Sequence, residues 1–147
     1  MADPDPLNFG VDLRDVRERL ERLAYFLSVT DVLDSAEALD DTLPASPPAA
    51  FVGVSSERAE PNRMIQGHSQ RVDCDVAILF VESAARMDRA AKDQLERTRK
   101  AVIRQLVAWK PKGTDKALDY LRYRVVKIGD GKVWAEVSFS TAYRLSI

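Results

Sequence analysis

The stretch that decides the fold is residues 70–82, which read QRVDCDVAILFVE. Apolar side chains recur at every second position from Val72 to Phe80, a period that is typical of a half-buried β-strand. The opposite face is charged up to Asp75 and apolar from Ala77 onward. We therefore expect a strand with one wet face in its first half and with both faces covered in its second half.

The segments that follow this strand predict a helix and a hairpin. Residues 86–109 carry an apolar stripe at helical spacing, and the sequence Lys-Pro-Lys-Gly at 110–113 ends the predicted helix. Residues 118–145 predict a long β-hairpin, because the alternating segments 120–128 and 133–143 flank a Gly-Asp-Gly turn. Glycine supplies the positive φ that such a tight turn needs.

The N-terminal third predicts shorter elements. Asp12 is the expected N-cap of a helix whose apolar face runs from Val11 to Leu27. Residues 26–33 read as extended, and residues 35–39 as one or two helical turns. Together these elements predict an α+β fold: an antiparallel sheet of about four strands with a long C-terminal hairpin, flanked by one long helix and one or two shorter helices.

A long polar segment stands between two of the predicted strands. Residues 50–54 predict a short strand, and residues 55–70 show no regular period. An irregular stretch of this length is uncommon inside a compact domain and is usually functional or mobile. We expect it to be mobile in the free protein and to be ordered where it docks on a partner.

Composition bounds the class of protein. The chain has 147 residues, is 46% hydrophobic and 31% charged, and carries a net charge of −1. These values predict one domain over residues 10–147, preceded by a mobile arm at 1–9 that contains two Asp-Pro pairs. The longest apolar run, residues 76–81, is far too short for a membrane span, and one cysteine cannot form an internal disulfide. No basic-then-apolar signal opens the chain, so we expect a cytoplasmic site of synthesis.

Charge is unevenly distributed along the chain. Residues 1–42 hold 11 acids and four bases, a net charge of −7, whereas residues 43–147 carry +6. The two parts attract each other, either within one fold or as acidic and basic faces that meet between identical subunits.

The sequence offers few groups for chemistry, and we predict no catalytic, metal or cofactor-binding residues. His68 and Cys74 are too few for a zinc site, and no nucleophile elbow or phosphate-binding glycine loop is present. Asp73 and Asp75 share a strand face. The weakest of three hypotheses is that this carboxylate pair holds a divalent ion in an enzyme.

A second hypothesis is a nucleic-acid-binding α+β module that uses the C-terminal hairpin. Basic and aromatic side chains interleave there: Tyr120, Arg122, Tyr123, Arg124, Lys127, Lys132 and Trp134. Such a surface can stack bases and hold phosphates. The sequence pI of about 5.9 argues against it, because nucleic-acid-binding domains are usually basic.

The order of several motifs resembles the tail terminator proteins of long-tailed bacteriophages and prophages. The motifs are PPAAFV at 47–52, QRV at 70–72 and LVAWKP at 106–111, followed by a closing hairpin with Trp134 and Tyr143. The resemblance covers roughly residues 11–145. It implies a helix-flanked antiparallel sheet that forms six-membered rings. In that family the ring caps the tail tube, stops its polymerisation and presents a surface to the head-side connector.

The resemblance implies a non-enzymatic virion protein that is located in the phage tail and, during assembly, in the host cytoplasm. The implied partners are further copies of the chain in a hexameric ring, the tail tube protein and the head–tail connector protein, with no membrane and no specific nucleic acid. The polar segment supplies the candidate subunit or tube interface, whose residues are Arg58, Glu60, Asn62, Arg63, Gln66 and His68.

Overall fold

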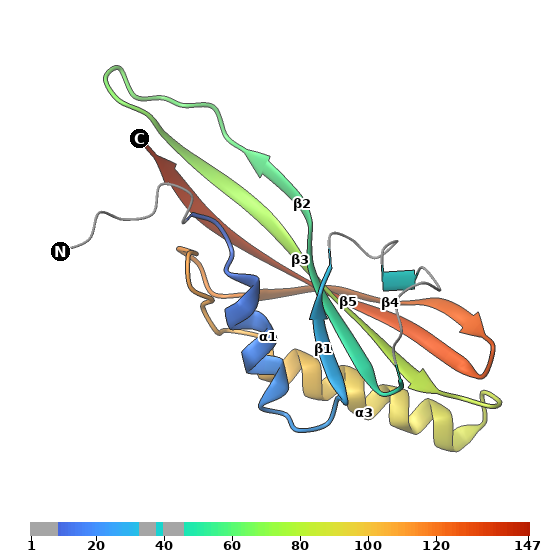
Figure 1. Cartoon of the computed structure of the whole chain (residues 1–147). Coiled ribbons are helices and arrows are strands. Elements are labelled where there is room, and N and C mark those ends of the chain that lie inside the picture. The colour runs from blue at the N-terminus through green and yellow to red at the C-terminus, as the bar shows by residue number, and fades with distance from the viewer. Residues whose placement is uncertain (1–8, 33–37, 40–45) are drawn as a thin grey trace.

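The computed structural model describes residues 9–32, 38–39 and 46–147. In chain order its elements are α1 (Leu13–Glu21), β1 (Ser28–Asp31), β2 (Ala49–Ala59), β3 (Ser69–Ser83), α3 (Arg89–Leu106), β4 (Asp119–Gly129) and β5 (Lys132–Ser146). The strands form a five-stranded sheet in the order β1-β2-β3-β5-β4, and α1 and α3 lie together on one side of it (Figure 1). The fold is α+β, as predicted.

The sheet is mixed, whereas the sequence predicts an antiparallel sheet of about four strands. β1 runs parallel to β2, with Ser28 opposite Ala49 and Asp31 opposite Val52, and all other neighbours are antiparallel. A parallel pair needs a crossover of about a dozen residues or more, and the connection over residues 32–48 is long enough. The fifth strand is this short parallel edge.

The central strands β3 and β5 carry the core. The alternation predicted for residues 70–82 is confirmed, because Val72 to Phe80 are buried at every second position and both faces are buried from Ala77 onward. Phe80 and Leu106 are both 0% exposed and belong to the cluster between the sheet and the helices. A smaller cluster covers the opposite face, where the ring of Phe51 stacks on that of Trp134.

The helices are shorter than predicted at their ends. Asp12 caps α1 as expected, and its side chain accepts a hydrogen bond from the Arg14 N–H at 3.0 Å. The chain leaves the helix soon afterwards, since Ala24 has φ 53°, and Leu27 is 70% exposed instead of lying on an apolar helix face. α3 begins after the N-cap Asp88, whose side chain accepts from Ala91 N–H at 2.9 Å.

The predicted irregular segment at 55–70 is wrong at both ends. β2 continues to Ala59 and β3 begins at Ser69, so the connecting loop spans residues 60–68. A register shift between Val54 and Ser56 interrupts the alternation of β2, and the residues that follow are exposed. Periodicity reports burial, so it does not detect a strand that is held by backbone pairing alone.

Several predictions fall outside the described residues. The predicted mobile N-terminal segment at 1–9 is described only at Phe9. The predicted helical turns at 35–39 are described only at Ala38 and Leu39, which are helical. Six of the 11 acids of residues 1–42 also lie outside, and the described residues 9–32 hold five acids and four bases. The pairing of acidic and basic faces therefore stays a prediction. Within the part of the chain that the structure describes, no helix is long and apolar enough to cross a membrane.

Candidate assembly surface

The sheet continues beyond the two helices as a three-stranded arm. It consists of the second half of β2, the first half of β3 and the last half of β5. β5 is paired with β3 from Asp75 to Ser69, and β2 is paired with β3 from Asp75 to Val72. The loop 60–68 and the C-terminus lie at the same far end, at the upper left of Figure 1. The arm therefore presents a surface that the helices do not cover.

Asn62 shapes the loop at the end of the arm. Its Oδ1 atom accepts hydrogen bonds from the backbone N–H groups of Met64 and Ser69, at 3.2 and 3.0 Å. The Gln70 amide donates across the loop to the Glu60 carbonyl oxygen at 2.9 Å. One side chain thus satisfies two backbone donors that a nine-residue turn would otherwise leave to water.

His68 joins the loop to the C-terminus. Its backbone exchanges hydrogen bonds with Ile147, whose carbonyl oxygen lies 3.3 Å from His68 N and whose N–H donates at 3.0 Å to the His68 oxygen. The His68 ring is hydrogen-bonded to the Gln70 side chain. These contacts give His68 a structural role in holding the loop against β5.

Three apolar side chains project from this end of the molecule. Met64 is 54% exposed, Ile65 is 102% exposed and Ile147 is 89% exposed. The His68–Ile147 backbone pair holds the C-terminal isoleucine beside the loop. We call these three residues the apolar tip. Single exposed apolar side chains are normal, but several gathered at the end of a protruding hairpin are typical of an interaction site.

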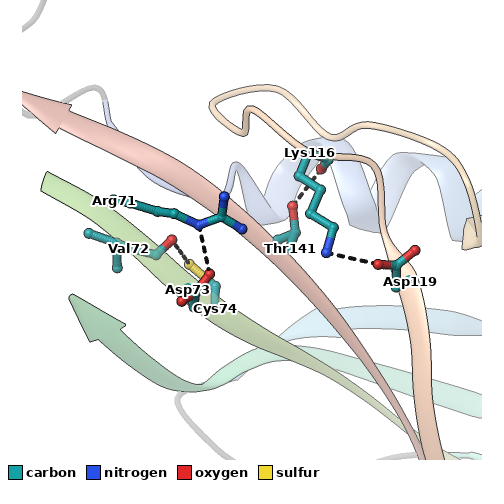
Figure 2. Close-up of polar contacts among 7 residues, drawn as sticks. All are labelled: Arg71, Val72, Asp73, Cys74, Lys116, Asp119 and Thr141. Carbon is teal, nitrogen blue, oxygen red and sulfur yellow. Dashed lines mark hydrogen bonds and ion pairs between the residues drawn. The ribbon is translucent and has the colours of Figure 1, made fainter. Parts of the chain in front are cut away.

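A cleft of about 280 Å³ lies beside the apolar tip and is rich in arginine. Arg63, Arg71 and Arg144 line it together with Glu60. Arg71 and Arg144 lie directly opposite each other in the β3–β5 register, a placement of like charges that costs stability unless an anion compensates it. Asp73 supplies part of that compensation, 3.1 Å from Arg71 Nε (Figure 2). The cleft can therefore accept a carboxylate from a partner.

The helix-side face of the arm holds a buried thiol and a phenol around one carboxylate. Glu57 Oε1 lies 3.7 Å from Cys74 Sγ, and the Tyr143 hydroxyl donates to Glu57 Oε2 at 3.2 Å. Burial raises the pKa of Cys74 to about 12, and the Glu57 charge adds to the rise. Burial and Glu57 likewise raise the pKa of Tyr143 to about 12. Cys74 is therefore a neutral, unreactive thiol.

The connection between α3 and β4 fixes the base of the arm. The Thr141 hydroxyl on β5 donates to the Lys116 carbonyl oxygen at 2.6 Å, and Lys116 Nζ lies 2.8 Å from Asp119 (Figure 2). Earlier in the same connection, the Lys112 carbonyl oxygen accepts a hydrogen bond from Asp12 N–H at 3.0 Å. This connection thus links the N-terminal segment to the sheet where the arm begins.

The six predicted interface residues divide by role. Glu60 and Arg63 line the cleft, Gln66 is exposed at the loop, and Arg58 lies on β2 opposite Asp73. Asn62 and His68 hold the loop in shape, as described above. The sequence reasoning missed Arg71 and Arg144, because only the strand register brings them together, and it missed the apolar tip because the segment reads as polar.

The two weaker hypotheses find little support in the geometry. Asp73 pairs with Arg71, and Asp75 accepts a hydrogen bond from the Ser56 hydroxyl at 3.3 Å. Among the described residues, no group of three or more His, Cys, Asp or Glu side chains is placed to hold a metal ion.

Two of the three hairpin aromatics pack against the fold, whereas Tyr120 is 38% exposed. Trp134 is 9% exposed and stacks on Phe51, and the Tyr123 ring packs under Arg99, 4.8 Å from its guanidinium carbon. Stacking bases would require these rings to leave the fold.

Comparisons with known proteins give one family and one fold. Residues 8–147 match the family model described as phage tail terminator protein. A chain in the virion of a native gene transfer agent particle has a similar structure, with a TM-score of 0.55 and 16% sequence identity. The similarity covers 94% of this chain and 96% of that one. No curated protein matches the sequence.

Proposed function

This chain belongs to the phage tail terminator family, a family of structural tail proteins, and from that premise we propose that it caps the phage tail tube. A ring of copies, which we take to be a hexamer, ends tube polymerisation on one side and forms the surface that joins the head–tail connector on the other. Residues 10–147 act in this as one tail-terminator domain. The protein assembles in the host cytoplasm and remains in the virion.

The observation that carries this proposal is that the subunit presents two unlike surfaces. One is the arm with its apolar tip and arginine cleft, and the other is the layer of α1 and α3 on one side of the sheet (Figure 1). A terminator needs different surfaces toward the tube and toward the connector. It also needs a subunit contact between unlike surfaces, because only such a contact closes into a ring by rotation.

We propose that four of the six predicted interface residues are assembly contacts and that the other two position them. Arg58, Glu60, Arg63 and Gln66 are exposed and available to a neighbouring subunit or to the tube protein, while Asn62 and His68 hold the loop that presents them. The tube protein and the connector are the partners of the assembled ring.

The decisive experiment is to image tails assembled with the tagged protein and to measure its mass by native mass spectrometry at several concentrations and salts. We expect a ring of density at the head-proximal end of the tube and a hexamer mass, at least for protein released from tails. A matched assembly that lacks this chain should give tubes of uncontrolled length. Tails that contain no copies of the chain, or tubes of normal length without it, would refute the proposal.

A further inference from the structure

We propose that the apolar tip of one copy inserts into an apolar depression between the α1–β1 connection and α3 of the next copy. This inference rests on the proposed ring, and it names the contact that builds it. The depression has a volume of about 260 Å³ and is lined by Leu23, Tyr25, Gln94, Arg97, Thr98 and Ala101.

A buried polar network makes this depression apolar. The Tyr25 hydroxyl donates to the Glu82 carboxylate at 2.7 Å, and the Thr98 hydroxyl donates to the same carboxylate at 2.5 Å. The Gln94 amide donates to the Tyr25 oxygen at 2.9 Å. Glu82 is 5% exposed, so the hydroxyls of Tyr25 and Thr98 turn inward to satisfy its carboxylate, and the Gln94 amide follows them. Mainly carbon atoms remain at the surface.

The tip and the depression are complementary in shape and chemistry. Ile65 projects fully from the hairpin loop, and the depression is large enough to accept its side chain with part of Met64. Removing these carbons from water supplies the driving force. Neither surface is covered by another described part of the same chain.

Charges beside the two surfaces match as well. The loop that holds the apolar tip also contains Glu60 and Arg63, which form no ion pair with another described residue. The rim of the depression carries Arg97, and Asp93 lies one helical turn before it on α3. Neither of these two forms an ion pair among the described residues either. Each surface therefore offers one acid and one base, so two ion pairs between the copies are possible and would favour one register of the contact.

The positions of the two surfaces make the contact head-to-tail. The hairpin loop lies at the upper left of Figure 1, whereas the chain after α1 meets α3 at the bottom of the view. The tip and the depression thus lie far apart on one chain, so the tip does not reach the depression of its own chain, and the contact joins unlike surfaces of two copies. Repetition of the contact closes a ring or grows a filament.

Cysteine cross-linking tests the contact directly. The double variant Ile65→Cys with Ala101→Cys should give a ladder of disulfide-linked multimers when rings or tails are oxidised. Each single variant should give no ladder. Native Cys74 is 1% exposed and does not compete. Both substituted positions are exposed, so the fold is retained. Rings that keep their mass but give no ladder would overturn this contact while leaving the proposed function intact.

Charge substitutions provide an independent test by mixing. Ile65→Asp and Ala101→Glu should each lower subunit association at least about tenfold, because each removes one side of an apolar contact. Mixed together, they retain one functional tip and one functional depression and should form dimers only. Ile128→Asp is the matched control, an isoleucine 62% exposed at the opposite hairpin, and should not change association. Full rings from Ile65→Asp alone would refute the contact, whereas absence of rings in the unmodified protein and in tails would refute the proposed function itself.

Discussion

A Cβ atom added to Gly113 would overlap the carbonyl oxygen of Gly10. The connection between α3 and β4 thus passes against the backbone that leads into α1, and Asp15 accepts from Lys112 N–H at 2.9 Å beside it. Gly113 also has φ 84°, in the left-handed region. Two residues far apart in sequence are thereby fixed where the N-terminal segment meets the base of the arm.

We predict that Gly113→Ala destabilises the fold by about 2–4 kcal/mol, because the clash adds to the cost of positive φ. Gly131→Ala is the matched control. Its φ is 72°, and nothing lies within 4 Å of the added carbon, so only the conformational cost of about 1 kcal/mol applies. Urea denaturation of both variants checks this, and equal losses would show that the backbones do not approach so closely.

The core between the sheet and the helices predicts how much stability is lost when its side chains are truncated. Phe80→Ala and Leu106→Ala should each cost about 2–5 kcal/mol, since both side chains are fully buried in one cluster. Leu27→Ala, at a position 70% exposed, should change the free energy of unfolding by less than about 0.5 kcal/mol. Chemical denaturation measures all three. A loss below about 1 kcal/mol at either buried site would mean that β3 and α3 do not pack as described.

These core contacts are the part of the fold that the sequence predicts well. β3, β5 and α3 each bury a continuous apolar face between the sheet and the helices, and such a face leaves a period of two or of about 3.6 in the chain. Helix starts are predicted less evenly. The Asp12 N-cap of α1 is predicted from residue type and is confirmed by the hydrogen bond that its side chain accepts from Arg14 N–H. The sequence does not predict the Asp88 cap, because the apolar stripe places the start of this helix at Arg86.

The arm and the cleft could not be predicted in this way. β2 beyond Val54 is held by backbone pairing to β3 after a register shift, and its exposed side chains carry no period. The cleft depends on the register that sets Arg71 opposite Arg144, two residues from different strands. The depression beside Tyr25 depends on the Glu82 carboxylate of β3, which is buried by the α1–β1 connection and by α3. Such juxtapositions are properties of tertiary packing.

The pKa values of Cys74 and Tyr143 predict how stability responds to alkali. Both are raised to about 12, from ordinary values of 9.0 and 10.0. The unfolded chain therefore releases these protons at lower pH than the folded chain does, so stability is complete below about pH 9 and falls between about pH 9 and pH 12. Denaturation at stepped pH should show this fall.

Glu57 separates the two causes of the shift. Glu57→Gln removes a negative charge that faces both groups, so their pKa values should fall and the alkaline loss of stability should become shallower. Glu60→Gln is the control, because it removes a nearby exposed acid that does not contact the thiol or the phenol. An unchanged profile for Glu57→Gln would assign the whole shift to burial.

The Asn62 side chain shapes the loop that carries the apolar tip. Asn62→Ala removes the acceptor for Met64 N–H and Ser69 N–H, and each such bond contributes about 0.5–1.5 kcal/mol. We expect hydrogen exchange of the Ser69 amide to speed up several-fold while core amides are unchanged. Asn62→Asp keeps an acceptor oxygen and should retain the protection, and Gln66→Ala, at an exposed position, should leave it intact. Because a loosened loop must be reordered before it docks, Asn62→Ala should also weaken subunit association without changing the exposed apolar surface. Unaltered exchange at Ser69 would show that Asn62 does not hold the loop.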